Sequence, residues 1–352
     1  MLLVIQRYTI DLTYPNIAIG QNGHRGLWTL VYNQGFEVTI MYRKYFAFFK
    51  YEELGKEIIS YCSETLPGWA HDIYSRDWSC FYADKSMETH SIHRNDLAIS
   101  SSISAPRKKR TVFEDINEIA TLPIAFDWRN VNGINYVPPV QRQESRYRIV
   151  TNNTLQPIFS RQDVISCSRY SQACKGGFPY LTAGKYAEDF GVVEEHCYPY
   201  EWTASPCRQV PDGQGCRRFY ATNYRYIGGY YGGCSEPLMR YALVNNGPLA
   251  ASLEISTDFM QYKGGIYRCT DGSNELNRTQ RFPSFHITNH VVLIVGYGME
   301  QNDDDGRSTP YWIVQNSIGT KWGENGYFRI VRGRNDCGIE SMAVEADPIP
   351  SY

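Results

Sequence analysis

The fold is decided by the stretch Asn289-His290-Val291-Val292-Leu293-Ile294-Val295-Gly296-Tyr297-Gly298. Its apolar run, residues 291–295, shows no polar alternation, which predicts a strand buried on both faces. A second segment, Val314-Gln315-Asn316-Ser317-Ile318-Gly319, supplies an amide. A histidine and an orienting amide form the pair that activates a thiol for acyl transfer. We therefore expect an acyl-transfer site whose thiol has still to be located.

The segments around this strand predict a helix-rich half followed by a strand-rich half. Helices are expected at residues 179–190, which stop before Gly191, and at residues 236–245, which Ser235 can cap. Strands are expected at residues 265–268, 290–296, 311–315 and 326–331. A cleft between two such halves is a natural place for a catalytic site.

Residues 1–83 predict a β-rich domain. Strand-like runs at 27–32 and 36–41 flank Asn33-Gln34-Gly35, which fits a hairpin loop, and residues 45–51 continue the aromatic pattern. Residues 84–121 are polar and predict a linker. The basic tetrad at 107–110 fits a solvated linker or a proteolytic processing site, and the many cysteines disfavour a nuclear signal.

Composition limits the classes of function. The chain has 352 residues and a formal charge of −2, which gives no reason to expect nucleic-acid binding. No apolar run reaches the roughly 18 residues that span a bilayer. Ten cysteines favour an oxidising compartment, and their spacings lack the C-x-x-C of a metal site, so we expect disulfides and no metal.

Two further features bear on export. Sequons at Asn152 and Asn277 add weak support for a secreted glycoprotein. The apolar start is interrupted by Gln6 and Arg7, which is too early for a secretory signal peptide. We therefore expect an exported protein whose signal peptide is not present in this chain.

Several segments together carry a family resemblance. They are Leu122-Pro123, Phe126-Asp127-Trp128-Arg129, Gly176-Gly177-Phe178-Pro179-Tyr180 and the segments around His290 and Asn316. These segments resemble the papain-family cysteine peptidases. Others are similar to the cathepsin C (dipeptidyl peptidase I) branch of that family: Ala183-Gly184-Lys185-Tyr186-Ala187, Tyr230-Tyr231-Gly232-Gly233-Cys234, Tyr32-Asn33-Gln34-Gly35-Phe36-Glu37 and Phe46-Ala47-Phe48-Phe49-Lys50-Tyr51. The resemblance covers nearly the whole chain except residues 84–121.

The resemblance implies an α+β, papain-like two-lobed fold. Its helical lobe would span about residues 122–235 and its β-barrel lobe about residues 236–352. Residues 1–83 would form a truncated antiparallel β exclusion-type domain, and residues 84–121 a linker or shortened propeptide. The family implies a lysosomal or secreted enzyme that removes N-terminal dipeptides from peptides and proteins, binds a chloride ion and forms homotetramers.

The resemblance also implies catalytic roles. His290 would be the base, Asn316 its orienting partner and Gln143 a donor to the oxyanion. A lone histidine or asparagine is usually structural, but the combination of three matched segments favours catalysis.

Binding roles are implied in the same way. The implied substrate contacts are Gly176, Gly177 and Asn289, and the implied chloride ligands are Tyr180 and Tyr226, for which ordinary core packing is the alternative. The implied disulfides are Cys167–Cys207 and Cys197–Cys216.

The nucleophile is where the chain departs from the family. The family's thiol follows the glutamine by about six residues, in a Cys-Gly-Ser-Cys stretch that starts the central helix, and Ile149 stands at that position here. Gln143 is followed instead by Glu144-Ser145-Arg146-Tyr147, which matches the far end of that helix. About 15 residues, or about 22 Å of helix, are therefore absent. Ser145 is out of register and a poor substitute, so we predict that the chain as written does not hydrolyse peptides.

Other departures agree with missing sequence. Cys62, Cys80 and Cys174 lose the partners that the resemblance would give them, and Ile318 replaces the tryptophan that shields the catalytic asparagine in the family. Three hypotheses follow. The chain is an incomplete gene model or splice form of an active enzyme, or a non-catalytic pseudopeptidase that retains a peptide-binding cleft, or an unstable product without a function.

Overall fold

The computed structural model describes residues 7–32, 34–54, 57–86, 118–138, 143–208, 210, 213, 215–269, 288–301 and 308–349. The chain divides into two compact units, one made of Met1–Thr13 and Ile17–Thr121 and the other of Tyr14–Asn16 and Leu122–Tyr352. Three sequence features lie outside the described residues: the basic tetrad at 107–110, the sequon at Asn277 and the loop residue Asn33.

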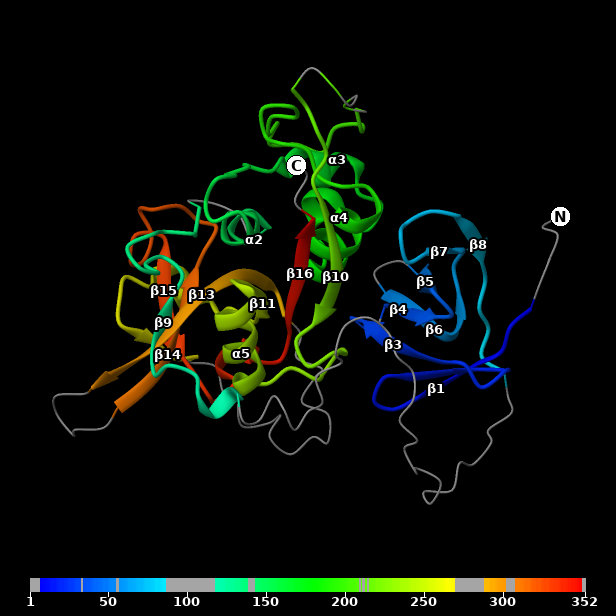
Figure 1. The fold of residues 1–352 in the computed structure, drawn as a ribbon, viewed down its shortest axis with the longest axis horizontal. Helices are drawn as coiled ribbons and strands as arrows, with labels where there is room; N and C mark the ends of the chain where they lie inside the picture. Colours follow the sequence, from blue (N-terminus) through cyan, green and yellow to red (C-terminus); the bar gives the residue numbers. More distant parts are fainter. Residues whose placement is uncertain are drawn as a thin grey trace. The chain divides into compact units, whose positions relative to one another are not determined.

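The N-terminal unit is an antiparallel sheet, as predicted from residues 1–83 (Figure 1). Its strands are β1 (Ile10–Thr13), β2 (Ile17–Gly20), β3 (Arg25–Val31), β4 (Gly35–Ile40), β5 (Arg43–Leu54), β6 (Glu57–Thr65), β7 (Gly68–Asp72) and β8 (Ser79–Phe81). They lie in the order β1-β2-β3-β4-β5-β7-β8, and β6 also pairs with β5. Ala18, Val38 and Ile40 form a small apolar core on this sheet. Gly35 lets β5 approach β4 closely, because a Cβ there would lie 2.4 Å from the carbonyl oxygen of Ala47.

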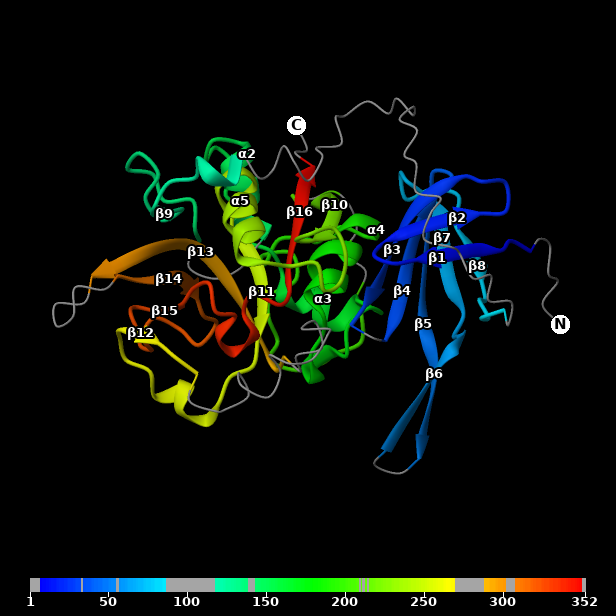
Figure 2. The same cartoon turned by 90° about the horizontal axis from the view of Figure 1, so that it is seen from below.

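The helices of the C-terminal unit precede most of its strands, as Figure 2 also shows. They are α2 (Gln143–Val150), α3 (Arg161–Cys167), η1 (Ala173–Lys175), η2 (Tyr180–Lys185), α4 (Tyr186–Asp189) and α5 (Glu236–Asn246). The predicted helix at 179–190 is a wide π-helical segment, η2, that continues into α4 and stops before Gly191, whose φ is +69°. Ser235 occupies the N-cap position of α5, as predicted, although its side chain makes no capping hydrogen bond.

The strands of the C-terminal unit form one sheet. They are β9 (Phe126–Asp127), β10 (Tyr220–Tyr226), β11 (Leu249–Leu253), β12 (Ile266–Tyr267), β13 (His290–Gln301), β14 (Ser308–Gln315), β15 (Tyr327–Val331) and β16 (Ala343–Ile349), with two short helical turns, η3 (Thr257–Gln261) and η4 (Asp336–Gly338), in the loops. The order is β10-β16-β11-β13-β14-β15-β12, and β9 pairs with β13. Residues 292–298 of β13 are buried, which confirms the buried strand predicted from its apolar run. The structure thus has the predicted α+β class, and β13 carries His290 at its first residue.

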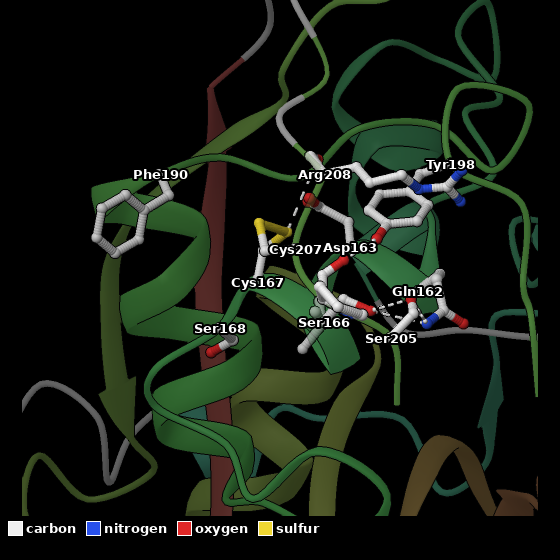
Figure 3. The surroundings of a disulfide bond; sticks show 12 residues. Gln162, Asp163, Ser166, Cys167, Ser168, Phe190, Tyr198, Ser205, Cys207 and Arg208 are labelled. Atoms are coloured by element: carbon white, nitrogen blue, oxygen red, sulfur yellow. Dashed lines mark hydrogen bonds between the residues drawn. A yellow bond between two sulfur atoms is a disulfide. The ribbon is translucent and has the colours of Figure 1, made fainter. Parts of the chain in front are cut away.

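Three disulfides join parts of the C-terminal unit. Two are the pairs that the resemblance implied, Cys167–Cys207 and Cys197–Cys216. The third, Cys269–Cys337, was not predicted. Figure 3 shows Cys167 at the end of α3 bonded to Cys207, beside a polar cluster in which Gln162 donates to Ser166 at 2.8 Å. These bonds fix the loops that follow α3 to the body of the unit.

No helix in the described ranges is long and apolar enough to cross a membrane.

Candidate active site

His290 and Asn316 lie side by side because their strands are paired. Leu293 of β13 pairs with Gln315 of β14, so the first residue of β13 lies beside the residue that follows β14. The Nε2 of His290 lies 2.9 Å from the Oδ1 of Asn316. The same Oδ1 accepts a hydrogen bond from the backbone N–H of Ser317 at 2.8 Å, which assigns it as an acceptor. The imidazole therefore donates from Nε2, and in its neutral form it holds its lone pair on Nδ1.

Aromatic side chains surround the imidazole of His290 in this pair. The ring of Phe259 lies 6.4 Å from that of His290, and Trp322 packs against Phe259 with ring centroids 5.1 Å apart. Asn316 is buried, with 8% of its surface exposed, whereas Ile318 is 42% exposed. Burial strengthens the His290–Asn316 hydrogen bond, because little water competes for it.

Asn289 is held by a two-point contact next to His290. Its Oδ1 accepts from the backbone N–H of Ile255 at 2.8 Å, and its Nδ2 donates to the carbonyl oxygen of Ile255 at 3.1 Å. Its own backbone N–H donates to the carbonyl oxygen of Leu253 at 3.1 Å. These contacts fix the backbone on one side of His290.

Gly176 and Gly177 follow η1 in the helical part of the unit. Gly176 has a φ of +120°, a conformation that residues with a side chain rarely adopt, and no atom lies within 4 Å of where its Cβ would be. Gly177 forms an isolated antiparallel bridge with Ser171. The open space at Gly176 would let another backbone approach closely.

Helix α2 begins at Gln143, whose side chain lies outside the described residues. Glu144 and Ser145 are both fully buried. The Oε1 of Glu144 accepts from the backbone N–H of Phe159 at 2.7 Å. Burial raises the pKa of Glu144 to about 8. The hydrogen bond from Phe159 lowers this pKa, but burial has the larger effect. Ser145 is thus enclosed in the core, away from solvent and from any peptide.

Pairing along β11 separates α2 from His290. A Cβ on Gly247 would lie 3.0 Å from the Cδ1 of Ile149, so α2 packs near the start of β11. Leu253, at the other end of β11, pairs with His290. The six residue-to-residue steps from Gly247 to Leu253 span about 20 Å of extended chain. Because α2 extends only about 5 Å from Arg146 to Gln143, it does not bring the Gln143 backbone to His290.

The described residues include four free cysteines: Cys62, Cys80, Cys174 and Cys234. The first two belong to the N-terminal unit. Cys174 lies in η1, and Cys234 precedes α5. Burial raises the pKa of Cys234 to about 12, so this thiol stays protonated and unreactive at neutral pH. None of these positions lies on β13, β14 or α2.

Tyr180 and Tyr226 stack on each other. Their ring centroids are 4.4 Å apart with an interplanar angle of 14°, and both residues are buried. Tyr180 starts η2 and Tyr226 ends β10, so the pair joins a helix to the sheet. Two buried phenol groups can donate hydrogen bonds to an anion, and they can equally serve as packing.

The chain belongs to the papain family of cysteine proteases, whose sequence profile matches residues 122–346. Residues 4–85 match the cathepsin C exclusion domain. The chain is therefore a cathepsin C-like member of that family, and the resemblance drawn from its segments is confirmed.

Individual relatives agree with this assignment. Cathepsin C from Schistosoma mansoni is 36% identical over 412 residues, covering 98% of this chain and 88% of that protein. Dipeptidyl aminopeptidase 1 from Plasmodium falciparum is 30% identical over 266 residues, covering 56% of this chain and 37% of that protein. Among solved structures, procathepsin B S9 from Trypanosoma congolense matches with a TM-score of 0.53 and 26% identity, over 71% of this chain and 84% of that one.

Sequence reasoning missed Glu144 and the pair Cys269–Cys337. After the implied pairs and the three orphaned cysteines were set aside, Cys234, Cys269 and Cys337 remained, and three cysteines do not define one pairing. The sequence around Glu144 predicts an ordinary exposed helix residue. Its hydrogen-bond partner, Phe159, is 15 residues away, so no local pattern indicates that the carboxylate is buried.

Proposed function

We propose that this chain is a form of a cathepsin C-like dipeptidyl peptidase that cannot cleave peptides as written. The observation that carries the proposal is the start of α2. The helix begins at Gln143 and continues at once into the buried residues Glu144 and Ser145, with no thiol-bearing segment between them. The pair of His290 and Asn316 then has a base and an orienting amide but no thiol to deprotonate.

The comparison with the Schistosoma mansoni relative supports missing sequence. Its alignment runs over 412 residues although this chain has 352, so at least 60 aligned positions have no residue here. We infer an incomplete gene model or a skipped-exon form of an active enzyme. Reading transcripts across codons 143–144 tests that inference, and an uninterrupted junction in most reads would count against it.

The purified chain is expected to leave peptide reporters intact. Removing a catalytic nucleophile lowers kcat by about 10⁶-fold in a serine protease, so hydrolysis should fall below the detection limit of the assay. The assay uses fluorogenic dipeptides with free and with blocked amino termini, with the Schistosoma mansoni relative as the positive control. Release that an epoxide thiol inhibitor abolishes would overturn the proposal.

A second candidate function is a pseudopeptidase that binds peptides without turnover. It is favoured by the intact surroundings of the site, since Asn289 keeps its two-point contact with Ile255 and Asn316 its contact with His290. Calorimetry with a dipeptide that has a free amino terminus distinguishes the two functions. Saturable binding supports the second candidate, and its absence in folded protein removes it.

We extend the proposal to the remaining family properties. By analogy with cathepsin C, the active form would act in a lysosomal or secreted compartment on peptide and protein substrates and assemble as a homotetramer. The three disulfides support an oxidising site of folding. Gel filtration of the purified chain tests the assembly, and a monomer at micromolar concentration would contradict it.

Chloride is proposed to bind at Tyr180 and Tyr226. Two buried phenols suit an anion as hydrogen-bond donors. Replacing chloride by sulfate is expected to lower Tm by about 2–4 °C, because a bound ion stabilises the fold by mass action. Tyr226→Phe should remove this difference. An equal Tm of the parent chain in both salts would contradict chloride binding, and Tyr180 and Tyr226 would then serve only as core packing.

A further inference from the structure

The disulfide Cys197–Cys216 has an imidazole at one of its two sulfurs. The Nε2 of His196 lies 3.3 Å from the Sγ of Cys197. The carboxylate of the preceding residue, Glu195, is paired with Arg161 at 3.8 Å, so the imidazole is left to the sulfur. With a proton on Nε2, the ring donates a hydrogen bond to this sulfur and stabilises the thiolate that forms when the disulfide opens. Cys197 is therefore the better leaving group of the two cysteines.

The other sulfur belongs to a basic surface hollow. Cys216 lines this hollow, and its other lining residues are Gly213, Gly215, Arg217, Arg218 and Tyr220. Arg217 is exposed, and its guanidinium lies 4.7 Å from the ring centroid of Phe219 without an ion pair to any described carboxylate. The positive charge of Arg217 attracts an anionic nucleophile to the side of Cys216.

The other two disulfides lack this arrangement. The sulfur of Cys167, which is bonded to Cys207, lies 4.0 Å from the carbonyl oxygen of Arg208 (Figure 3). A carbonyl oxygen is an acceptor, so it disfavours a thiolate at that position. In the pair Cys269–Cys337, Cys337 is only 2% exposed, so its sulfur is closed to solutes. Cys197–Cys216 is thus the disulfide whose surroundings favour exchange.

The segment that this disulfide closes has other anchors at both ends. Phe219 and Val192 exchange two backbone hydrogen bonds of 2.9 Å each. At the other end, the carbonyl oxygen of Tyr198 accepts from the Oγ of Ser160 at 2.6 Å. Opening the disulfide therefore leaves these ends in place, and the exchange can occur on the folded unit.

We propose that Cys197–Cys216 is a thiol-exchange site for a small anionic thiol. The thiolate of that molecule attacks the Sγ of Cys216 and forms a mixed disulfide there. The bond between the two cysteine sulfurs breaks, and its electron pair leaves on Cys197 as a thiolate, which His196 stabilises. One disulfide and one thiolate replace another disulfide and another thiolate, so no further oxidant or reductant is needed. The inference is independent of catalysis, because none of these residues belongs to the proposed active site.

Reduced glutathione is the probe, because it has two carboxylates and one ammonium group. The exposed free cysteines of the full chain are first blocked with iodoacetamide. Timed reactions with glutathione are then stopped with excess N-ethylmaleimide, which traps the released thiol, and the products are mapped by mass spectrometry. We expect glutathione on Cys216 and maleimide on Cys197, at least about tenfold faster than any product at Cys167–Cys207. Equal rates at the two disulfides would overturn the site, and glutathione mainly on Cys197 would overturn the direction of attack.

Two variants separate the role of the imidazole from that of the cation. His196→Ala should slow exchange about tenfold with both glutathione and 2-mercaptoethanol, whereas His24→Ala, at another exposed histidine, should have no effect. Arg217→Ala should slow exchange with glutathione about threefold and leave the rate with 2-mercaptoethanol, which has no carboxylate, unchanged. His196 and Arg217 are exposed, so both variants should fold. Unchanged rates in both variants would overturn the proposal, because exposure alone would then explain the exchange.

Discussion

Inserting the family's nucleophile segment between Gln143 and Glu144 is expected to raise peptide hydrolysis by at least about 10⁵-fold over the chain as written. The insert would be the 15 or so residues that the family resemblance places between Gln143 and Glu144. They would restore the thiol next to His290 and extend the central helix towards the cleft. The measurement is initial rates on peptide reporters with free and with blocked amino termini.

The existing core should accept this insert because its contacts lie downstream of the junction. Tyr147 donates to the carbonyl oxygen of Tyr220 at 2.6 Å, and Glu144 accepts from Phe159 at 2.7 Å. Neither contact involves residues before the junction. The same insert with serine in place of its nucleophilic cysteine is the matched control and should be inactive. If that control hydrolyses the reporters equally well, the lost thiol is not what silences this chain.

His290→Ala in the extended chain provides a second control. It should lower kcat by several orders of magnitude and leave the expression and Tm of the protein nearly unchanged, because His290 is only partly buried. Full activity in this variant would mean that the pair with Asn316 is structural and has no part in proton transfer.

The strands were the easiest part of the fold to predict, because their apolar pattern is local. The run at 291–295 identifies β13, and its neighbours at 311–315 and 326–331 correspond to β14 and β15. The outer half of β13 was missed, since it runs to Gln301 and pairs there with Ser308 of β14. The last three residues of that extension, Met299, Glu300 and Gln301, are exposed, so their strand conformation comes from hairpin pairing and not from a buried apolar run.

The proximity of His290 and Asn316 could be predicted only through the family resemblance. In physical terms it depends on the register of β13 with β14, which a sequence does not display directly.

The position of α2 is a different case. The sequence indicates that Gln143 and Glu144 cannot both keep their family positions, but the choice between them depends on packing. Glu144, Arg146 and Tyr147 are buried and have hydrogen-bond partners at Phe159, Asp347 and Tyr220. The helix therefore keeps these three residues, and the position of Gln143 follows from theirs.

Glu144→Gln is expected to stabilise the chain at pH 8 and to have little effect at pH 4.5. Burial raises the pKa of Glu144 from 4.5 to about 8. The folded chain therefore holds this proton more tightly than the unfolded chain, so the fold loses stability as the pH rises from about 4.5 through 8. Nearby Arg148 and Arg161 oppose the rise, and Glu195 adds to it. Full ionisation would cost the fold up to roughly 5 kcal/mol.

Urea unfolding at pH 4.5, 6 and 8 measures this effect. The chain should lose several kcal/mol of unfolding free energy between the first and last pH, and Glu144→Gln should recover most of that loss. The recovery should be incomplete, because burial also raises the pKa of Asp163 and Glu340. Glu64→Gln changes a glutamate whose side chain is 54% exposed and should leave the pH profile as it was. If the unfolding free energy of Glu144→Gln changed with pH in parallel with that of the parent, water or a rearranged α2 would be solvating the Glu144 carboxylate. The absence of the family's helix segment would then have loosened the core around this side chain.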